Sequence, residues 1–204
     1  MIVKQGTFPP LSNNCYLIVD EATNQSALVD CSYWNGKMEA LIGDTDLKYI
    51  LLTHGHYDHI GAVKQVKERY GAKVVISKED EPMLSSGKLS LAVFTRGETA
   101  YTSADITVHD GDELQLGEIT IKVMATPGHT KGGLCYLAED CLFTGDTLFC
   151  CSCGRTDFPG GSGEEMLQSL RRIKALDGDY KIYPGHEDIS TLEFERKNNP
   201  YMNM

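Results

Sequence analysis

The sequence predicts an α+β protein in which helices pack on the outside of two β-sheets. Short apolar runs of strand length occur in both halves of the 204-residue chain, and patterns typical of amphipathic helices follow several of them. Apolar residues make up 41% of the chain and charged residues 24%, a balance that supports a sizeable core under a solvated surface. The length suits one domain, and we expect residues 1–204 to form it.

Strands and helices alternate in the first half of the chain. The expected strands are residues 1–8, 14–21, 26–31, 47–53 and 72–77. Turn-forming Pro, Asn and Ser residues separate the first three, whereas the last two are apolar runs typical of buried strands. One helix is predicted around residues 36–43. A second is predicted over residues 62–70, where Val63, Val66 and Tyr70 share one face.

The second half follows a similar plan. Its expected strands are residues 113–117, 119–125, 132–139, 141–146 and 180–185. A long helix is predicted over residues 164–176, because Ser162 and Glu165 form a capping box and apolar residues follow at helical spacing. Ser190 and Glu193 predict the cap of a short terminal helix.

Charge and hydropathy limit the classes of partner. The formal net charge is −10 and the sequence pI is about 5.0, so neither nucleic acid nor an anionic membrane surface is an expected partner. No window approaches the roughly 20 apolar residues of a membrane helix, and the first residues lack the features of a signal peptide. We therefore expect a cytoplasmic protein whose seven cysteines are reduced. The pattern indicates no particular oligomeric state.

The stretch LLTHGHYDHIGAV, residues 51–63, holds three of the six histidines. His54 and His56 are two residues apart, so they share one side of extended backbone and can clamp one cation. Asp58 and His59 follow beyond the turn and face a second position. A lone histidine is usually a hydrogen-bonded core residue, but this spacing is typical of metal ligands.

Three further ligand-type residues, His129, Asp146 and His186, each follow an apolar strand and a small turn residue. Strand ends at one edge of a sheet converge on one cleft, so we expect these side chains to reach the histidine cluster. Imidazole and carboxylate groups are ligands of zinc, iron and manganese. Seven such ligands are too many for one tetrahedral zinc and suit two ions about 3.5–4 Å apart, with one carboxylate between them.

Other chemistry-bearing residues are expected outside this site. His109 is predicted to be a hydrogen-bonded core histidine. Cys150, Cys151 and Cys153 resemble a soft-metal patch, but Cys-x-Cys without a second pair is poor zinc-finger spacing. We therefore expect reduced thiols that bind no metal.

Residues 81–105 join the two halves and show no clear helical or strand period. Long loops of this kind are often functional. We expect this segment to cover the cleft and to supply apolar substrate contacts through Leu91, Phe94 or Tyr101. The alternative is an ordinary surface connector with a short helix.

The motifs THGHYDH, PGHT, TGDTLF and PGHED, in this order, resemble the metallo-β-lactamase fold superfamily over nearly the whole chain. The resemblance implies a four-layer αββα sandwich with a dimetal site at one edge of the two sheets. It also implies the grouping of the ligands: His54, His56 and His129 in the first metal site; Asp58, His59 and His186 in the second; Asp146 as the bridging carboxylate.

The loops SCGRTDFPGGS and PGHEDISTLEFERKNNP resemble the glyoxalase II branch, in particular its short bacterial members. Glyoxalase II hydrolyses S-D-lactoylglutathione. The chain ends 18 residues after His186, so we expect no C-terminal helical glutathione-binding domain, and Asp188 replaces a tyrosine of the family motif. Arg155 stands where glyoxalase II has a lysine that contacts the thiol carrier. It is expected either to bind a carboxylate or phosphate of the carrier or to pair with Asp157.

The resemblance implies a metal-dependent hydrolase that cleaves a thioester-type acyl bond of a small-molecule acyl-thiol. Two transition-metal ions, zinc first and iron or manganese as alternatives, would hold a bridging hydroxide as the nucleophile. Asp58 is expected to be a ligand that also orients this hydroxide. One alternative is a persulfide dioxygenase with a mononuclear non-haem iron held by His54, His129 and Asp146. Another is a non-catalytic, metal-stabilised binding module.

Overall fold

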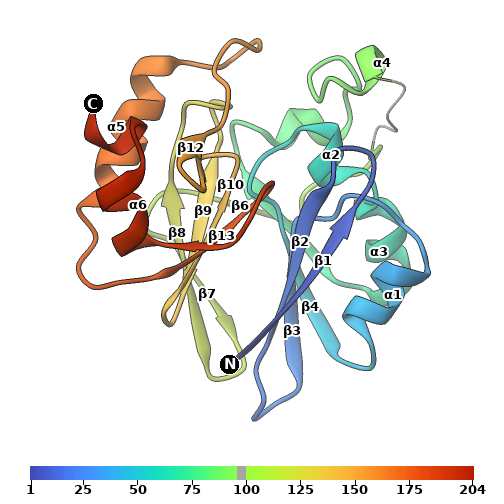
Figure 1. Ribbon diagram of the computed structural model, residues 1–204. Coiled ribbons are helices and arrows are strands. Elements are labelled where there is room, and N and C mark those ends of the chain that lie inside the picture. The colour runs from blue at the N-terminus through green and yellow to red at the C-terminus, as the bar shows by residue number, and fades with distance from the viewer. Residues whose placement is uncertain (96–99) are drawn as a thin grey trace.

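The computed structural model describes residues 1–95 and 100–204, which form two six-stranded β-sheets facing each other (Figure 1). The strands of the first sheet are, in spatial order, β1 (Ile2–Phe8), β2 (Asn13–Val19), β3 (Gln25–Val29), β4 (Asp46–Leu51), β5 (Lys73–Ser77) and β6 (Ile106–Val108). The first three strands pair antiparallel, and β3 to β6 pair parallel. The parallel part brings the carboxyl ends of neighbouring strands to one edge of the sheet.

The second sheet comes from the second half of the chain. Its strands are, in spatial order, β14 (Ser190–Thr191), β13 (Lys181–Pro184), β10 (Cys141–Gly145), β9 (Leu134–Ala138), β8 (Ile119–Ala125) and β7 (Glu113–Leu116). β10 and β13 pair parallel, and the other neighbours pair antiparallel. A separate small hairpin consists of β11 (Leu148–Phe149) and β12 (Ser152–Cys153).

Helices cover the outer faces of both sheets (Figure 1). Beside the first sheet lie α1 (Gly36–Ile42) and α3 (Val63–Tyr70), and beside the second lie α5 (Gly163–Lys174) and α6 (Leu192–Asn198). The short elements are α2 (Tyr57–Ile60), α4 (Ala92–Thr95), and the 3₁₀ turns η1 (Glu81–Leu84) and η2 (Tyr201–Asn203). The order helix, sheet, sheet, helix is the predicted αββα sandwich.

Three apolar cores separate the four layers. Along β3, Leu28 packs toward the helices, whereas Ala27 and Val29 pack between the sheets. Successive side chains of a strand point to opposite faces, and here both faces are buried. This is why the strand sequences are continuous apolar runs rather than alternating patterns. Between the sheets, Tyr16 meets Phe143 with ring centroids 5.7 Å apart.

The helix caps test the predicted boundaries. The Ser162 hydroxyl accepts a hydrogen bond from the Glu165 amide at 3.3 Å, which confirms the predicted start of α5. The cap of α6 is Thr191, whose hydroxyl accepts from the Phe194 amide at 3.2 Å. The prediction of Ser190 was therefore wrong by one residue. Ser190 instead lies in β14, and its hydroxyl bonds the Glu195 carboxylate.

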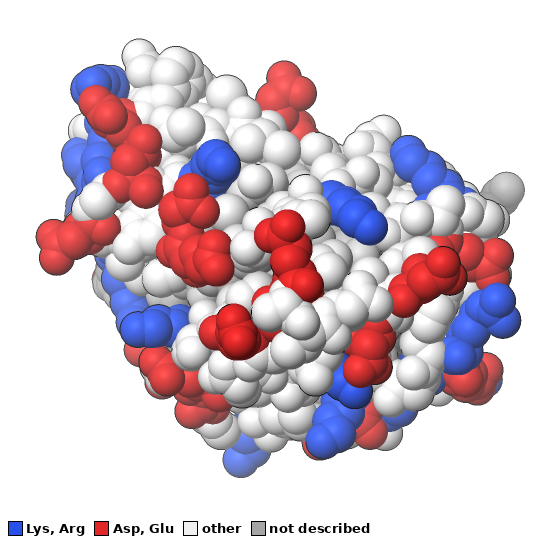
Figure 2. Space-filling model, turned by 90° about the horizontal axis from the view of Figure 1, so that it is seen from below, with Lys and Arg blue, Asp and Glu red and all other residues white. Residues whose placement is uncertain are grey.

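The lower end of the molecule as drawn in Figure 1 is shown from below in Figure 2. Acidic side chains spread over much of this face and basic ones lie scattered among them without forming a basic patch, in keeping with the net charge of −10. Among the described residues, no helix combines the length and apolar character that a membrane span needs.

Candidate metal centre

The seven predicted ligands lie at one edge of the two sheets. Each comes from the end of a strand or from the short helix that follows one. His54 and His56 follow β4, and Asp58 and His59 lie in α2. His129 follows β8, Asp146 follows β10, and His186 follows β13. In Figure 1 this edge is marked by α2, at the top between the two sheets.

The potential ligand atoms form three overlapping groups, in each of which all atoms lie within 4.8 Å of one another. The groups are His54, His56 and His129; Asp58, His59 and His186; and His54, His59 and Asp146. Asp146 links the first two groups, because its Oδ1 lies 3.3 Å from His59 Nε2 and its Oδ2 lies 3.5 Å from His129 Nε2. Asp146 thus lies between the first two groups, with one carboxylate oxygen near each.

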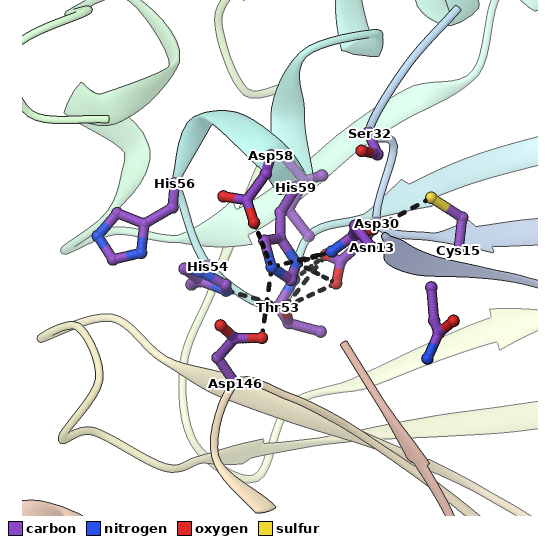
Figure 3. Close-up of polar contacts among 12 residues, drawn as sticks. Asn13, Cys15, Asp30, Ser32, Thr53, His54, His56, Asp58, His59 and Asp146 are labelled. Carbon is purple, nitrogen blue, oxygen red and sulfur yellow. Dashed lines mark hydrogen bonds and ion pairs between the residues drawn. The ribbon is translucent and has the colours of Figure 1, made fainter. Parts of the chain in front are cut away.

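A buried carboxylate behind the cluster orients His59 (Figure 3). Asp30 Oδ2 accepts from His59 Nδ1 at 2.8 Å, and the other ring nitrogen, Nε2, lies 2.9 Å from Asn13 Nδ2 and also faces Asp58 and Asp146. Asp30 also accepts from the amide and the hydroxyl of Thr53. A histidine whose second ring nitrogen donates to a carboxylate is the usual arrangement of a metal-binding imidazole.

Backbone and hydroxyl groups orient two further histidines in the same way. His129 Nδ1 donates to the backbone carbonyl of Arg155 at 2.7 Å, so Nε2 points inward and lies 2.9 Å from His56 Nδ1. His54 Nδ1 lies 3.2 Å from the Thr53 hydroxyl. In both rings the outward nitrogen thus lies against a protein oxygen, and the other nitrogen is left to face the cluster, as a metal-binding imidazole requires.

A second buried carboxylate, Asp80, ties together the two loops that carry His56 and His129. It accepts from the amides of Gly55 at 3.1 Å and Gly132 at 2.9 Å, and from the Thr130 hydroxyl at 2.7 Å. Burial raises the pKa of Asp80, although these three donors oppose that shift.

Sequence reasoning missed both supporting carboxylates. Asp30 has a signal in the sequence, since it follows an apolar strand in SALVD just as Asp146 does in CLFTGD. Asp80 has no comparable signal, because it lies in the turn after β5 and becomes relevant only through its contacts.

The protonation of the cluster follows from burial and from neighbouring charge. Burial and the adjacent imidazoles lower the pKa of His54, and they lower that of His56 to about 3, so both rings are neutral. Burial is the largest influence and would raise the pKa of Asp58 and Asp146, but the neighbouring histidines, His59 first among them, together outweigh it and lower both. Burial likewise opposes protonation of His59, yet the three nearby carboxylates raise its pKa. The carboxylates around His59 thus favour a positive charge, from a proton or a metal ion, within the cluster.

The residues present fit metal ions. His54 Nε2 and Asp146 Oδ1 are two of the four buried side-chain polar atoms in the described residues that make no hydrogen bond. Such orphaned atoms are costly unless something binds them. Gly185 borders the same place, where a Cβ would lie 2.5 Å from Asp146 Oδ1 and 2.7 Å from His59 Cε1. The donor set of imidazoles and carboxylates matches zinc, iron or manganese.

A pocket of about 700 Å³ opens above the cluster. Its lining includes Leu91 and Phe94, whereas Tyr101 is 71% exposed and is not part of that lining. Part of the predicted covering segment, residues 96–99, lies outside the described residues. The described remainder holds η1 and α4, so it places apolar side chains at the pocket and also contains the short helix of the alternative prediction.

Arg155 also lines the pocket. Its Nε and Nη2 donate to the two oxygens of Asp157 at 2.6 and 2.7 Å, and its guanidinium lies 4.1 Å from the centre of the Phe158 ring. The ion pair that the sequence offered as one of two roles for Arg155 is therefore present, within reach of the cleft.

Two predictions about residues outside the site need correction or refinement. His109 is not a core residue: its side chain is exposed beside Asp112, because β6 ends one residue before it. All seven cysteines are free, as predicted. However, the thiols of Cys150 and Cys151 lie within 4.8 Å of a Glu195 carboxylate oxygen, while Cys153 lies apart on the pocket wall.

Comparison with known proteins agrees with this geometry. Residues 8–186 match the family model described as metallo-beta-lactamase superfamily. The chain is 34% identical over 197 residues to the probable polyketide biosynthesis zinc-dependent hydrolase BaeB of Bacillus velezensis. The aligned region covers 93% of this chain and 81% of that protein. It is 38% identical over 178 residues to a hydroxyacylglutathione hydrolase of Pelagibacter ubique, covering 86% of this chain and 66% of that protein.

Solved structures show the same fold over the full chain. The crystal structure of BLEG-1 B3 metallo-beta-lactamase has a TM-score of 0.91 and 30% identity, with 100% of both chains covered. ETHE1 from Myxococcus xanthus has a TM-score of 0.78 and 33% identity, covering 98% of this chain and 84% of that one. TTHA1623 in a di-iron-bound form has a TM-score of 0.86 and 28% identity, covering 97% of this chain and 99% of that one. The chain is therefore a glyoxalase II-like member of the metallo-beta-lactamase superfamily, with the metal-binding hydrolase site of that family at the edge of its two sheets.

Proposed function

We propose that this protein hydrolyses a thioester-type acyl bond of a small-molecule acyl-thiol in the cytoplasm. The observation that carries the proposal is the convergence of seven imidazole and carboxylate side chains at one place, where five of them line an open pocket. The likeness to a hydroxyacylglutathione hydrolase supports a thioester as the scissile bond, because that is the bond its name implies. The likeness to BaeB supports zinc-dependent hydrolysis.

Two transition-metal ions, zinc first and iron or manganese as alternatives, are the proposed cofactors. One ion would be held by His54, His56 and His129, the other by Asp58, His59 and His186, with Asp146 between them. When bound, such ions supply Lewis acidity that lowers the pKa of coordinated water to about neutral and polarises a carbonyl. The di-iron form of TTHA1623 supports a pair of ions rather than one.

The chain's own residues would orient the reactants. Asp58 lines the pocket, and its Oδ2 lies 3.2 Å from His186 Nε2, so the carboxylate is held at the reaction site. We propose that Asp58 accepts a hydrogen bond from the attacking water and thereby directs its lone pair at the acyl carbon. The thiolate is a good leaving group and needs no proton donor. Of the three expected substrate contacts, Phe94 and Arg155 line the pocket and are the proposed ones, whereas Tyr101 does not line it.

The second candidate is the persulfide dioxygenase predicted from the GRTDF loop, with one iron held by His54, His129 and Asp146. The convergence of Asp58, His59 and His186 on a complete second group favours the dinuclear hydrolase over this reading. The third candidate, a non-catalytic binding module, predicts that no substrate is turned over.

One set of measurements on the same preparation separates these candidates. Protein purified without added metal is analysed for metal content and assayed for thiol release from acyl thioesters. Oxygen uptake is measured with glutathione persulfide. We expect about two metal ions per chain, thiol release and no oxygen uptake. A single iron with oxygen uptake would establish the dioxygenase.

A chromogenic β-lactam completes the set, because BLEG-1 is described as a B3 metallo-beta-lactamase. Faster turnover of the β-lactam than of every thioester would overturn the proposal. Absence of turnover in all assays, with metal bound, would leave the binding module.

A further inference from the structure

Two phenyl rings pack against the candidate metal centre, one against each of two ligand groups. Phe158 meets the His56 ring edge-on, with centroids 5.8 Å apart, and Phe149 meets the His186 ring edge-on at 6.1 Å. His56 belongs to the first ligand group and His186 to the second. Both rings line the same pocket, so an acyl group whose carbonyl reaches both ligand groups has apolar ring surface beside it.

The rim of the pocket is apolar as well. Leu11, from the loop between β1 and β2, is 54% exposed, and Phe94, from α4, is 70% exposed. These side chains come from distant parts of the sequence and line the same opening. Large apolar side chains that are left exposed around a cavity commonly mark a binding site. An apolar tail that leaves the cleft would cover both.

The charges around the opening disfavour an anionic carrier. Apart from the candidate metal ligands, the charged side chains among the described lining residues are Arg155 and Glu187. Asp157 occupies two donors of the Arg155 guanidinium and balances its charge. Glu187 adds a carboxylate at the mouth. The described wall therefore offers no uncompensated cation to the two carboxylates of glutathione or the phosphates of coenzyme A.

We propose that the site takes acyl groups with an apolar tail, of medium-chain or aryl type, carried on an uncharged thiol. This inference rests on the proposed thioester hydrolysis and specifies its substrate class. The aromatic walls and the apolar rim select the tail, and the Glu187 carboxylate together with the balanced Arg155 pair disfavours charged carriers.

The test uses the metal-loaded full chain and one neutral thiol, N-acetylcysteamine, carrying acetyl, butyryl, hexanoyl or octanoyl groups. We expect kcat/KM to rise about fourfold for each methylene that the cavity buries, until the pocket is filled. Octanoyl-glutathione and octanoyl-coenzyme A should be slower than octanoyl-N-acetylcysteamine. A flat chain-length series, or a preference for the glutathione ester, would overturn the inference.

Two variants on the same helix locate the selectivity. Phe94→Ser should lower the octanoyl-to-acetyl ratio of kcat/KM about tenfold, because the apolar rim loses a ring. Val93→Ser is the matched control: Val93 neighbours Phe94 and is 64% exposed, but it does not line the pocket. Equal octanoyl-to-acetyl ratios of kcat/KM in the two variants would contradict the assignment of Phe94 to the rim that contacts the acyl tail.

The outcomes keep the two proposals distinct. If no thioester of the series releases its thiol although metal is bound, the proposed hydrolase function fails. If all four esters are hydrolysed at similar rates, hydrolysis stands and only the substrate class is wrong.

Discussion

The floor and the walls of the pocket are held in place by different kinds of interaction. On the floor, His54 and His59 are buried and Asp146 is largely covered, and each is oriented by or faces other polar groups of the cluster. On the walls and rim, Phe158 and Phe94 are partly or largely exposed and make few directional contacts. Groups that must meet one geometry need buried, hydrogen-bonded support, whereas apolar contacts tolerate small displacements. We therefore expect changes in the floor to abolish turnover and changes in the walls to redirect it.

The largest effect is expected from Asp146→Asn. The amide removes the negative charge shared by both ligand groups, so both should bind metal more weakly. Metal content should fall well below that of the parent protein, and kcat/KM should drop by about 10³-fold or more because water activation is lost. His186→Ala should weaken mainly the group that contains Asp58 and His59.

His109→Ala is the control for these substitutions. His109 is exposed and stands outside all three ligand groups. Metal content and turnover should stay at the parent level. A loss comparable to that of Asp146→Asn would show that the ligand assignment is wrong.

The second effect concerns the support behind the floor. Asp30→Asn removes the carboxylate that fixes the His59 tautomer, and such second-sphere changes typically cost about 10–100-fold in metal affinity or activity. The His59 Nδ1 proton should lose its hydrogen-bonded NMR signal. Asp80→Asn is a matched variant, since Asp80 is equally buried but holds the loops of His56 and His129.

Asp80→Asn should keep the NMR signal of the His59 Nδ1 proton while it weakens metal binding by the first ligand group, which holds His56 and His129. If both variants changed the same proton signal to the same extent, the two carboxylates would not act on separate histidines.

The contrast between floor and walls also explains what the sequence could predict. The ligands were predictable because His54, His56, Asp58 and His59 form a compact pattern, and because strand ends meet at a sheet edge whatever the loops do. The fold followed from apolar runs buried on both faces.

The walls were harder to predict, because a phenyl ring in a loop or in a two-residue strand carries no periodic signal. Phe149 and Phe158 become wall residues only through the positions of His186 and His56. His109 shows the reverse error: next to a strand it suggested core, but the strand ends at Val108 and leaves it exposed. Local pattern predicts elements better than it predicts where an element stops.

The third effect concerns Phe158, a wall residue whose loss should change substrate selectivity without changing metal content. Phe158→Ala removes the ring that faces His56 and underlies Arg155, so kcat/KM for an octanoyl thioester should fall about tenfold. The acetyl thioester should lose less, since its short acyl group contacts less of the wall. Metal content, measured on the same sample, should match the parent protein. Loss of metal would mean that Phe158 belongs to the support of the floor.

The smallest effect is expected from the exposed pair of Arg155 and Asp157. Because Asp157 holds both Nε and Nη2 of Arg155, the guanidinium is occupied before any substrate arrives. Arg155→Ala should therefore lower kcat/KM within about fivefold, equally for esters of N-acetylcysteamine and of glutathione, since exposed ion pairs contribute little. A selective loss for the glutathione ester would mean that Arg155 grips the anionic carrier.

Asp157→Asn is the informative partner of that change. The neutral amide leaves Arg155 in place but unbalances its charge at the pocket wall, so the guanidinium becomes available to a carboxylate. The glutathione ester should then gain in kcat/KM relative to the N-acetylcysteamine ester, and Arg155→Ala in the same background should remove the gain. If Asp157→Asn left the ratio of the two esters unchanged, the guanidinium would be out of reach of the thiol carrier. The charge of the wall would then have to be set by Glu187 alone among the described residues that line the pocket outside the metal centre.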